Sequence, residues 1–275
     1  AITSATGRQN NFVNVPDVVS VTGTFSEVVN VSGTPTLTLF VGSDNRTASY
    51  ASGTGSDDLV FQYTIQSGDN DTNGISIGAN ALALNSGTIS DPAGNNSTLT
   101  HSLVDNNSDY KVDTMAPWAK SFTMDDTEFK IGDNATVGLV FSEAVILFNS
   151  DDDISAPRGS LSTMTSSDNI TWSGTFTPTD NIEDDTNTLS LDNSTNFYTD
   201  PAGNRGSDNQ TANYEVDTKE PTVSSVAITS ASGIQNNFVN ATDNVSVTAT
   251  FSEAVNVNTT NGTPTLTIVV GSDNR

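Results

Sequence analysis

Short runs of apolar residues alternate with polar ones along the whole chain. Residues 19–25 (VSVTGTF) and 36–41 (TLTLFV) show a period of two, which is the pattern of a strand with one buried face. No window keeps a helical period over ten or more residues. Clusters of Asn, Asp, Gly, Ser and Pro separate the runs at intervals of about ten residues, as in sandwiches and barrels. The pattern predicts an all-β fold.

The sequence also repeats itself over a long period. AITSATGRQNNFVN at 1–14 recurs as AITSASGIQNNFVN at 227–240, and GTPTLTLFVGSDNR at 33–46 recurs as GTPTLTIVVGSDNR at 262–275. Such a period indicates an array of similar structural units.

Three shorter motifs recur inside this period. They are Phe-Ser-Glu at 25–27, 141–143 and 251–253, Asp-Pro-Ala-Gly-Asn at 91–95 and 200–204, and Tyr-x-Val-Asp-Thr at 110–114 and 214–218. The Phe-Ser-Glu motifs are spaced by 116 and 110 residues, so each domain is expected to take roughly 105 to 115 residues.

The repeats predict an A–B–A′ organisation. Residues 1–113 are expected to form a type A domain that lacks its first few residues, and residues 114–217 a type B domain. Residues 218–275 are expected to form the N-terminal half of a second type A domain. We therefore expect the chain to be a window on a longer polypeptide.

These motifs in fixed order resemble bacterial immunoglobulin-like tandem repeats, and they are similar to the extender region of giant RTX-type surface adhesins. The resemblance covers essentially the whole chain. It implies tandem immunoglobulin-like Greek-key β-sandwiches in an elongated rod at the bacterial cell surface, which holds a terminal ligand-binding region away from the cell. It further implies that Ca²⁺ at or near the domain junctions stiffens the rod, and that each repeat has the neighbouring repeats as its partners.

The charge of the chain is strongly acidic. It has 33 Asp and Glu against nine Lys and Arg, which gives a formal net charge of -24, so a nucleic-acid interface is not expected. Carboxylates a few ångströms apart lie within the Debye length of about 8 Å and repel one another. Bound cations would offset this repulsion. Alternatively, the acidity serves only to keep a surface protein soluble.

The chain contains no cysteine and one histidine. Disulfides and thiolate metal sites are therefore excluded, and the oxygen ligands that remain favour Ca²⁺ over zinc or copper. No apolar run is long enough to span a membrane, so we expect no membrane insertion within this segment. We also expect any targeting signal to lie outside it.

The best candidate metal ligands lie at the predicted domain junctions. Asp113 and Asp217 each end a strand directly before a Thr-x-x-Pro linker, where one ion could bridge two domains. The glutamates of the three Phe-Ser-Glu motifs, Glu27, Glu143 and Glu253, could reach the same pole. Solvated charges at strand ends are the alternative interpretation.

Other candidates lie in acidic loops. Asp69, Asp71 and Asn73 carry oxygen ligands at alternating positions before a glycine, as calcium loops do. The helix-loop-helix version is excluded because residue 80 is Asn instead of the bidentate Glu. The Asp-Pro-Ala-Gly-Asn motifs add the candidates Asp91, Asn95, Asp200 and Asn204. Tight turns without a metal are the alternative for both kinds of loop.

Nothing in the sequence predicts an enzyme. His101 is the one possible histidine base, and the alternation around it predicts a solvent-facing side chain on a strand. Trp118 and Trp172 are expected in core or junction packing, and residues 151–153, three consecutive aspartates, in a solvated loop.

Three functions fit these observations. The first is the structural extender that the resemblance implies. The second is a subunit of an extracellular filament or surface layer, in which other copies complete the last domain by strand addition. The third is a glycan- or surface-binding module, which would need clustered exposed aromatic residues.

Overall fold

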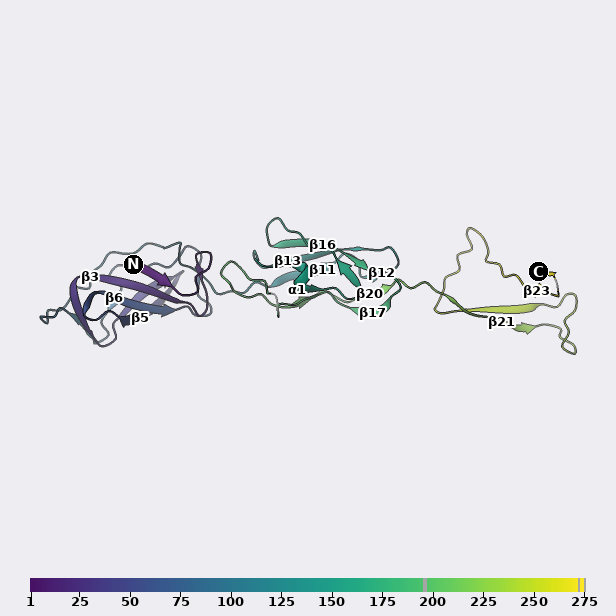
Figure 1. Ribbon diagram of the computed structural model, residues 1–275, viewed down its shortest axis with the longest axis horizontal. Helices are drawn as coiled ribbons and strands as arrows, with labels where there is room; N and C mark the ends of the chain where they lie inside the picture. The colour runs from purple at the N-terminus through teal and green to yellow at the C-terminus, as the bar shows by residue number, and fades with distance from the viewer. Residues whose placement is uncertain (195–196, 272, 275) are drawn as a thin grey trace.

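The computed structural model describes residues 1–194, 197–271 and 273–274 (Figure 1). Within them the chain is built almost entirely of β-strands, and α1 (Ser150–Asp153) is the only helix. The predicted all-β fold is confirmed, and its sheets are those of immunoglobulin-like β-sandwiches. No helix in the described part of the chain is long and apolar enough to cross a membrane.

The first sandwich is built on one large and one small sheet. The large sheet has the order β1-β3-β6-β5-β4-β8, with β9 paired to β3, and the small sheet has the order β2-β10-β7. Both sheets bury alternate apolar side chains in one core that runs from Ile2 to Val112. The strands are β1 (Ile2–Ala5), β2 (Phe12–Val13), β3 (Val18–Ser32), β4 (Thr36–Val41), β5 (Asp44–Ser52), β6 (Ser56–Thr64), β7 (Asn70–Asp71), β8 (Leu82–Ala83), β9 (Thr88–Ser90) and β10 (Lys111–Asp113).

The second sandwich has a separate core, between Ala119 and Val216. Its sheets have the orders β11-β13-β16-β15, β12-β20-β17 and β14-β18-β19. Trp172 packs against this core as expected, with its ring centroid 4.8 Å from that of Phe148. The strands are β11 (Ala119–Met124), β12 (Glu128–Phe129), β13 (Ala135–Phe141), β14 (Ile154–Ser155), β15 (Gly159–Leu161), β16 (Thr171–Pro178), β17 (Glu183–Asn187), β18 (Ser190–Leu191), β19 (Asn209–Gln210) and β20 (Tyr214–Asp217).

The third segment repeats the first pairing of the first sandwich. Strands β21 (Val223–Ala231) and β22 (Val245–Phe251) pair Ile228 with Val247, just as β1 and β3 pair Ile2 with Val21. In the first sandwich Ile2 is buried, whereas its counterpart Ile228 is 68% exposed. The remaining strands here are β23 (Val269–Val270) and β24 (Asp273–Asn274).

The three aspartates at 151–153 correct one prediction. They do not form a solvated loop, because Asn149 caps the one-turn helix α1 and its side chain accepts a hydrogen bond from the Asp151 amide. The turn carries Asp153 inward, so that only 1% of this residue is exposed. A local sequence pattern could not predict this burial, since it follows from the pairing of β14 with β18.

The environment of His101 also differs from the prediction. No strand contains residues 99–103, and His101 is half-buried. Its Nε2 accepts a hydrogen bond from the Ala81 amide at 2.9 Å, and its Nδ1 lies 2.8 Å from the Ser102 carbonyl oxygen. The imidazole therefore links two chain segments, because both of its ring nitrogens have backbone partners.

A buried ion pair crosses the core edge of the first sandwich. Asp69, whose side chain is fully buried, accepts a hydrogen bond from Arg46 Nε at 2.6 Å and another from the Tyr63 hydroxyl at 2.6 Å. Removal of one partner from a buried pair leaves the other without compensation. The pair therefore fixes the turn before β7 to strands β5 and β6.

We expect Asp69→Ala to destabilise the first sandwich by about 3 kcal/mol, which lowers its calorimetric melting temperature by about 10 °C or more. Asp44→Ala is the matched control, since Asp44 also contacts Arg46 but its side chain is 55% exposed, and surface pairs contribute less than about 1 kcal/mol. Equal small shifts in both variants would show that the buried pair does not hold this turn.

Candidate metal centre

The Asp-Thr pairs at the domain ends hold the start of each linker. Asp113 Oδ1 accepts a hydrogen bond from the Met115 amide at 3.0 Å. The Thr114 hydroxyl accepts one from the Gly68 amide at 3.0 Å and donates one to the Asp69 carbonyl at 2.9 Å. The hydroxyl of Thr218, the counterpart of Thr114, accepts a hydrogen bond from the Ile182 amide and donates one to the Thr179 carbonyl. The linker therefore leaves each sandwich in a fixed direction.

The serines of the second and third Phe-Ser-Glu motifs, Ser142 and Ser252, fix the other end of each linker. The Trp118 amide donates to Ser142 Oγ at 3.1 Å, and the Ser142 amide donates to the Trp118 carbonyl at 2.8 Å. Thr222 and Ser252 repeat this exchange at 2.9 and 2.8 Å. Trp118, 44% exposed, thus joins the junction through its backbone. The neighbouring glutamate of the motif is held at the junction as a result.

The Asp-Pro-Ala-Gly-Asn motif forms the same closed turn in both sandwiches. Asp200 accepts hydrogen bonds from the Asn204 amide at 2.9 Å and from Asn204 Nδ2 at 2.8 Å. Asp91 and Asn95 form the same two bonds at 2.8 and 2.7 Å. Gly203 has a φ of 87°, which a residue with a side chain adopts at a cost. The predicted tight turn is therefore present at both motifs.

Asparagine side chains attach this turn of the second sandwich to the first sandwich. Asn10 Nδ2 donates to the Pro201 carbonyl at 2.9 Å, and Asn14 Nδ2 donates to the Ala202 carbonyl at 2.8 Å. In the opposite direction, Asn204 Nδ2 donates to the Asp113 carbonyl at 2.9 Å. Sequence reasoning did not identify these contacts, although the Gln-Asn-Asn-Phe-Val-Asn segment at 9–14 recurs unchanged at 235–240.

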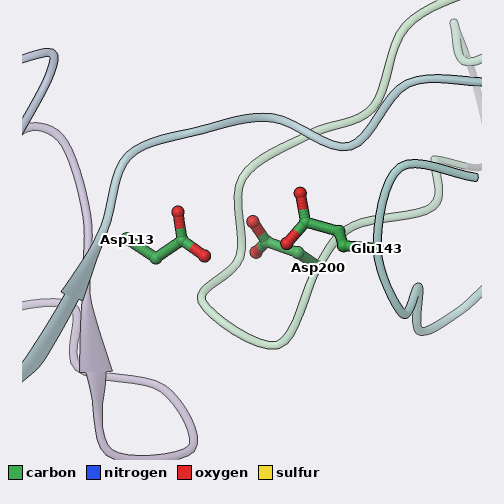
Figure 2. A group of neighbouring side chains, drawn as sticks. All are labelled: Asp113, Glu143 and Asp200. Atoms are coloured by element: carbon green, nitrogen blue, oxygen red, sulfur yellow. The ribbon is translucent and has the colours of Figure 1, made fainter. Parts of the chain in front are cut away.

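The result is a cluster of three carboxylates, which we call the junction triad: Asp113, Glu143 and Asp200. One ligand oxygen from each lies within 4.8 Å of the other two. Figure 2 shows the three carboxyl groups facing one another, with Asp113 at the end of its strand and the other two in loops of the second sandwich. Each member comes from a different one of the three motifs.

The electrostatics of the triad are unfavourable. Asp200 is fully buried and the other two residues are half-buried. Burial, together with the charges of Asp113 and Asp200, raises the pKa of Glu143 to about 7. Burial also raises the pKa of Asp200, despite its hydrogen bonds from Asn204. No Lys or Arg in the described residues forms an ion pair with the triad.

The Asp-Pro-Ala-Gly-Asn turn of the first sandwich gives an internal comparison. Hydrogen bonds from Asn95 lower the pKa of Asp91, and they outweigh the opposing effect of burial. Asp91, Asn95 and the exposed Glu27 line one cavity at the corresponding pole of this sandwich. The same motif therefore carries a carboxylate with a lowered pKa in the first sandwich and a buried one with a raised pKa in the second.

The second junction contains the counterparts of two triad members, Asp217 and Glu253. Asp217 is exposed and accepts a hydrogen bond from the Lys219 amide at 3.3 Å. Glu253 is half-buried. The structure does not gather these two residues into a group of three acidic ligands.

The acidic loop at 69–73 has a different use. All four carboxylate oxygens of Asp69 and Asp71 accept hydrogen bonds, those of Asp71 from the amides of Gly42, Asn73 and Gly74. Asn73 is exposed. These bonds close the turn, so we do not include the loop in the candidate centre.

The comparisons with known proteins agree with this architecture. Residues 113–216 match the family model of the bacterial Ig-like domain. The second sandwich is thus similar to a bacterial Ig-like repeat, a module commonly found on extracellular or surface proteins and typically without enzymatic activity. The comparisons with curated proteins and with solved structures found no match.

The raised pKa of Glu143 predicts that stability falls with pH in chelator. The unfolded group titrates near 4.5 and the folded group near 7, so the folded state holds the proton more tightly, and stability is lost as pH rises between these values. Because solvent screens this half-buried group, the loss is about 1 kcal/mol, or several degrees in melting temperature.

Melting of the whole chain at pH 5, 6, 7 and 8 measures this loss, and Glu143→Gln should remove most of the slope. Glu27→Gln is the control at the same motif position in the first sandwich. A slope that persists unchanged in Glu143→Gln contradicts the assignment to Glu143.

Proposed function

We propose that this chain is part of the extender region of a large bacterial surface adhesin, and that Ca²⁺ bound by the junction triad aligns neighbouring domains in an elongated rod. The observation that carries the proposal is the triad itself, whose three carboxylates meet between two sandwiches. A site of this kind exists only when both domains are in place, because Asp113 belongs to one and Glu143 and Asp200 to the other.

The chemistry of the ligands supports calcium. Ca²⁺ binds oxygen ligands such as carboxylates, and its coordination geometry is flexible. A divalent cation would offset the repulsion among the three charges and would favour the ionised form of Glu143. Extracellular calcium modules bind at about 10⁻⁴ to 10⁻³ M, so we expect the site to fill at millimolar calcium.

The linker supports a rod. Pro117 and Pro221 restrict the backbone of the two linkers, and Ser142 and Ser252 fix the strand that follows each. The two sandwiches and the third segment follow one another along the longest axis of the molecule (Figure 1). In this proposal the domains supply reach, and no residue has a catalytic role.

Small-angle scattering of the whole chain in millimolar Ca²⁺ and in excess chelator tests the proposal. Calcium should increase the maximum dimension and the melting temperature, because calcium at a hundredfold its dissociation constant stabilises the folded state by about 2.7 kcal/mol. Both effects should be lost in Asp113→Asn combined with Glu143→Gln.

The matched control is Glu27→Gln combined with Asp91→Asn, which changes the same motif residues in the first sandwich. This variant should respond to calcium as the unchanged chain does. If calcium changes neither quantity in the unchanged chain, the calcium-stiffened rod is wrong, although the repeat fold would stand.

A further inference from the structure

The chain carries two copies of the loop that holds the turn of the second sandwich. The first loop, residues 9–14, contacts this turn through the side chains of Asn10 and Asn14. The second loop, residues 235–240, has the same sequence, Gln-Asn-Asn-Phe-Val-Asn, and every one of its residues is exposed. The element that docks at the first junction is therefore present a second time, at the surface of the third segment.

The two loops have the same backbone conformation. In each, the glutamine and the phenylalanine exchange two backbone hydrogen bonds, of 2.9 and 2.7 Å in the first loop and of 3.0 and 2.9 Å in the second. The two asparagines between them have φ values of 50° and 68° in the first loop and of 49° and 68° in the second. The amide of the last asparagine donates to the aspartate three residues on, Asp17 at 3.0 Å or Asp243 at 2.8 Å. The second loop thus has the shape in which the first holds its turn.

The partner of the loop, the Asp-Pro-Ala-Gly-Asn turn, is also present twice. Both turns close with the same hydrogen bonds between aspartate and asparagine, and their glycines, Gly94 and Gly203, have φ values of 94° and 87°. In the turn that the first loop contacts, Ala202 is 2% exposed, whereas its counterpart Ala93 is exposed. The turn at 91–95 therefore presents to solvent a face that the other turn buries.

The contact between loop and turn uses only features that both turns have. The side-chain amides of Asn10 and Asn14 donate to the backbone carbonyls of the proline and the alanine of the turn. A Cβ on Gly203 would lie 2.6 Å from Nε2 of Gln9, so the glycine lets the glutamine side chain approach the turn closely. The turn at 91–95 has the same proline, alanine and glycine. It therefore offers the same carbonyls and the same close approach.

The second sandwich has a shorter connection in place of the loop. Residues 6–11 connect β1 to β2 in the first sandwich, whereas only residues 125–127 connect β11 to β12. Lys130 follows β12 as Asn14 follows β2, and its amide likewise donates to the aspartate three residues on. The Lys130 ammonium pairs with that same aspartate, Asp133, at 2.8 Å. The amide-bearing loop is therefore a feature of the type A segments.

We propose that the loop at 235–240 docks on the turn at 91–95 of a second copy of this chain. The amides of Asn236 and Asn240 donate to the carbonyls of the turn, as their counterparts do between the first two sandwiches. The third segment and the first sandwich lie at opposite ends of the molecule (Figure 1), so the copies associate head to tail. Such a heterologous interface can continue from copy to copy. The contact is made by neutral groups, and it rests on neither the junction triad nor the function proposed above.

Analytical ultracentrifugation of the whole chain in chelator and physiological salt, which screens its net charge of -24, tests the proposal. We expect the weight-average mass to rise above the 28.7 kDa of one chain at concentrations up to about 0.3 mM. Asn236→Asp combined with Asn240→Asp should abolish this rise, because carboxylate oxygens would then face carbonyl oxygens. The matched control, Asn256→Asp combined with Asn261→Asp, adds the same charge at exposed positions of the same segment and should associate as the unchanged chain does.

A mixture of two blocked chains identifies the two surfaces. Ala93→Gln places a larger side chain on the exposed turn and leaves the loop intact, whereas the double variant at Asn236 and Asn240 leaves the turn intact. Each should stay a monomer alone, and their mixture should reach the mass of a dimer and no more. Far-UV circular dichroism checks that each variant is folded. An unchanged chain or a mixture that stays monomeric overturns the proposal, and so does association of the Ala93→Gln chain alone, because its loop would then dock elsewhere.

Discussion

The junction between the first two domains is governed by the repulsion of carboxylates that packing removes from water. Asp200 is fully buried because the turn that carries it lies against the end of the first sandwich. Asp113 and Glu143 approach it from the two sides of the linker. No basic side chain among the described residues offsets them, so the stability of the interface depends on what neutralises this group.

Neutral hydrogen bonds, in contrast, define the geometry of the junction. The amides of Asn10, Asn14 and Asn204 join the two domains, and Ser142 holds the first strand of the second one. These bonds do not depend on pH or on a cation. The domain contact is therefore specified by amides and serines, while the acids are positioned to make its strength conditional on ionic conditions. The serine exchange recurs at the second linker, between Thr222 and Ser252.

The two sandwiches show how one fold accepts different interiors. The first buries the carboxylates of Asp69 and Asp71, and the second buries those of Asp153 and Asp200 and the amide of Asn193. Apolar packing needs no partner, whereas a buried amide or carboxylate does. The first domain supplies such partners to Asp69 from Arg46 and Tyr63, whereas one side-chain oxygen each of Asp153 and Asn193 has no partner in the described residues of the second domain.

The sequence alone determined the class of fold and the positions of the motifs, because period-two alternation and turn residues are local properties. It also placed all three members of the junction triad among twelve candidates. It could not separate them from Asp69 and Asp71, which sit in equally acidic turns, because the donors that occupy those two come from residues as distant as Gly42 and Arg46. Nor could it predict that Asp153 is buried. Burial and the identity of hydrogen-bond partners depend on segments far apart in sequence, so only the tertiary structure decided which acids close turns and which lie together between the sandwiches.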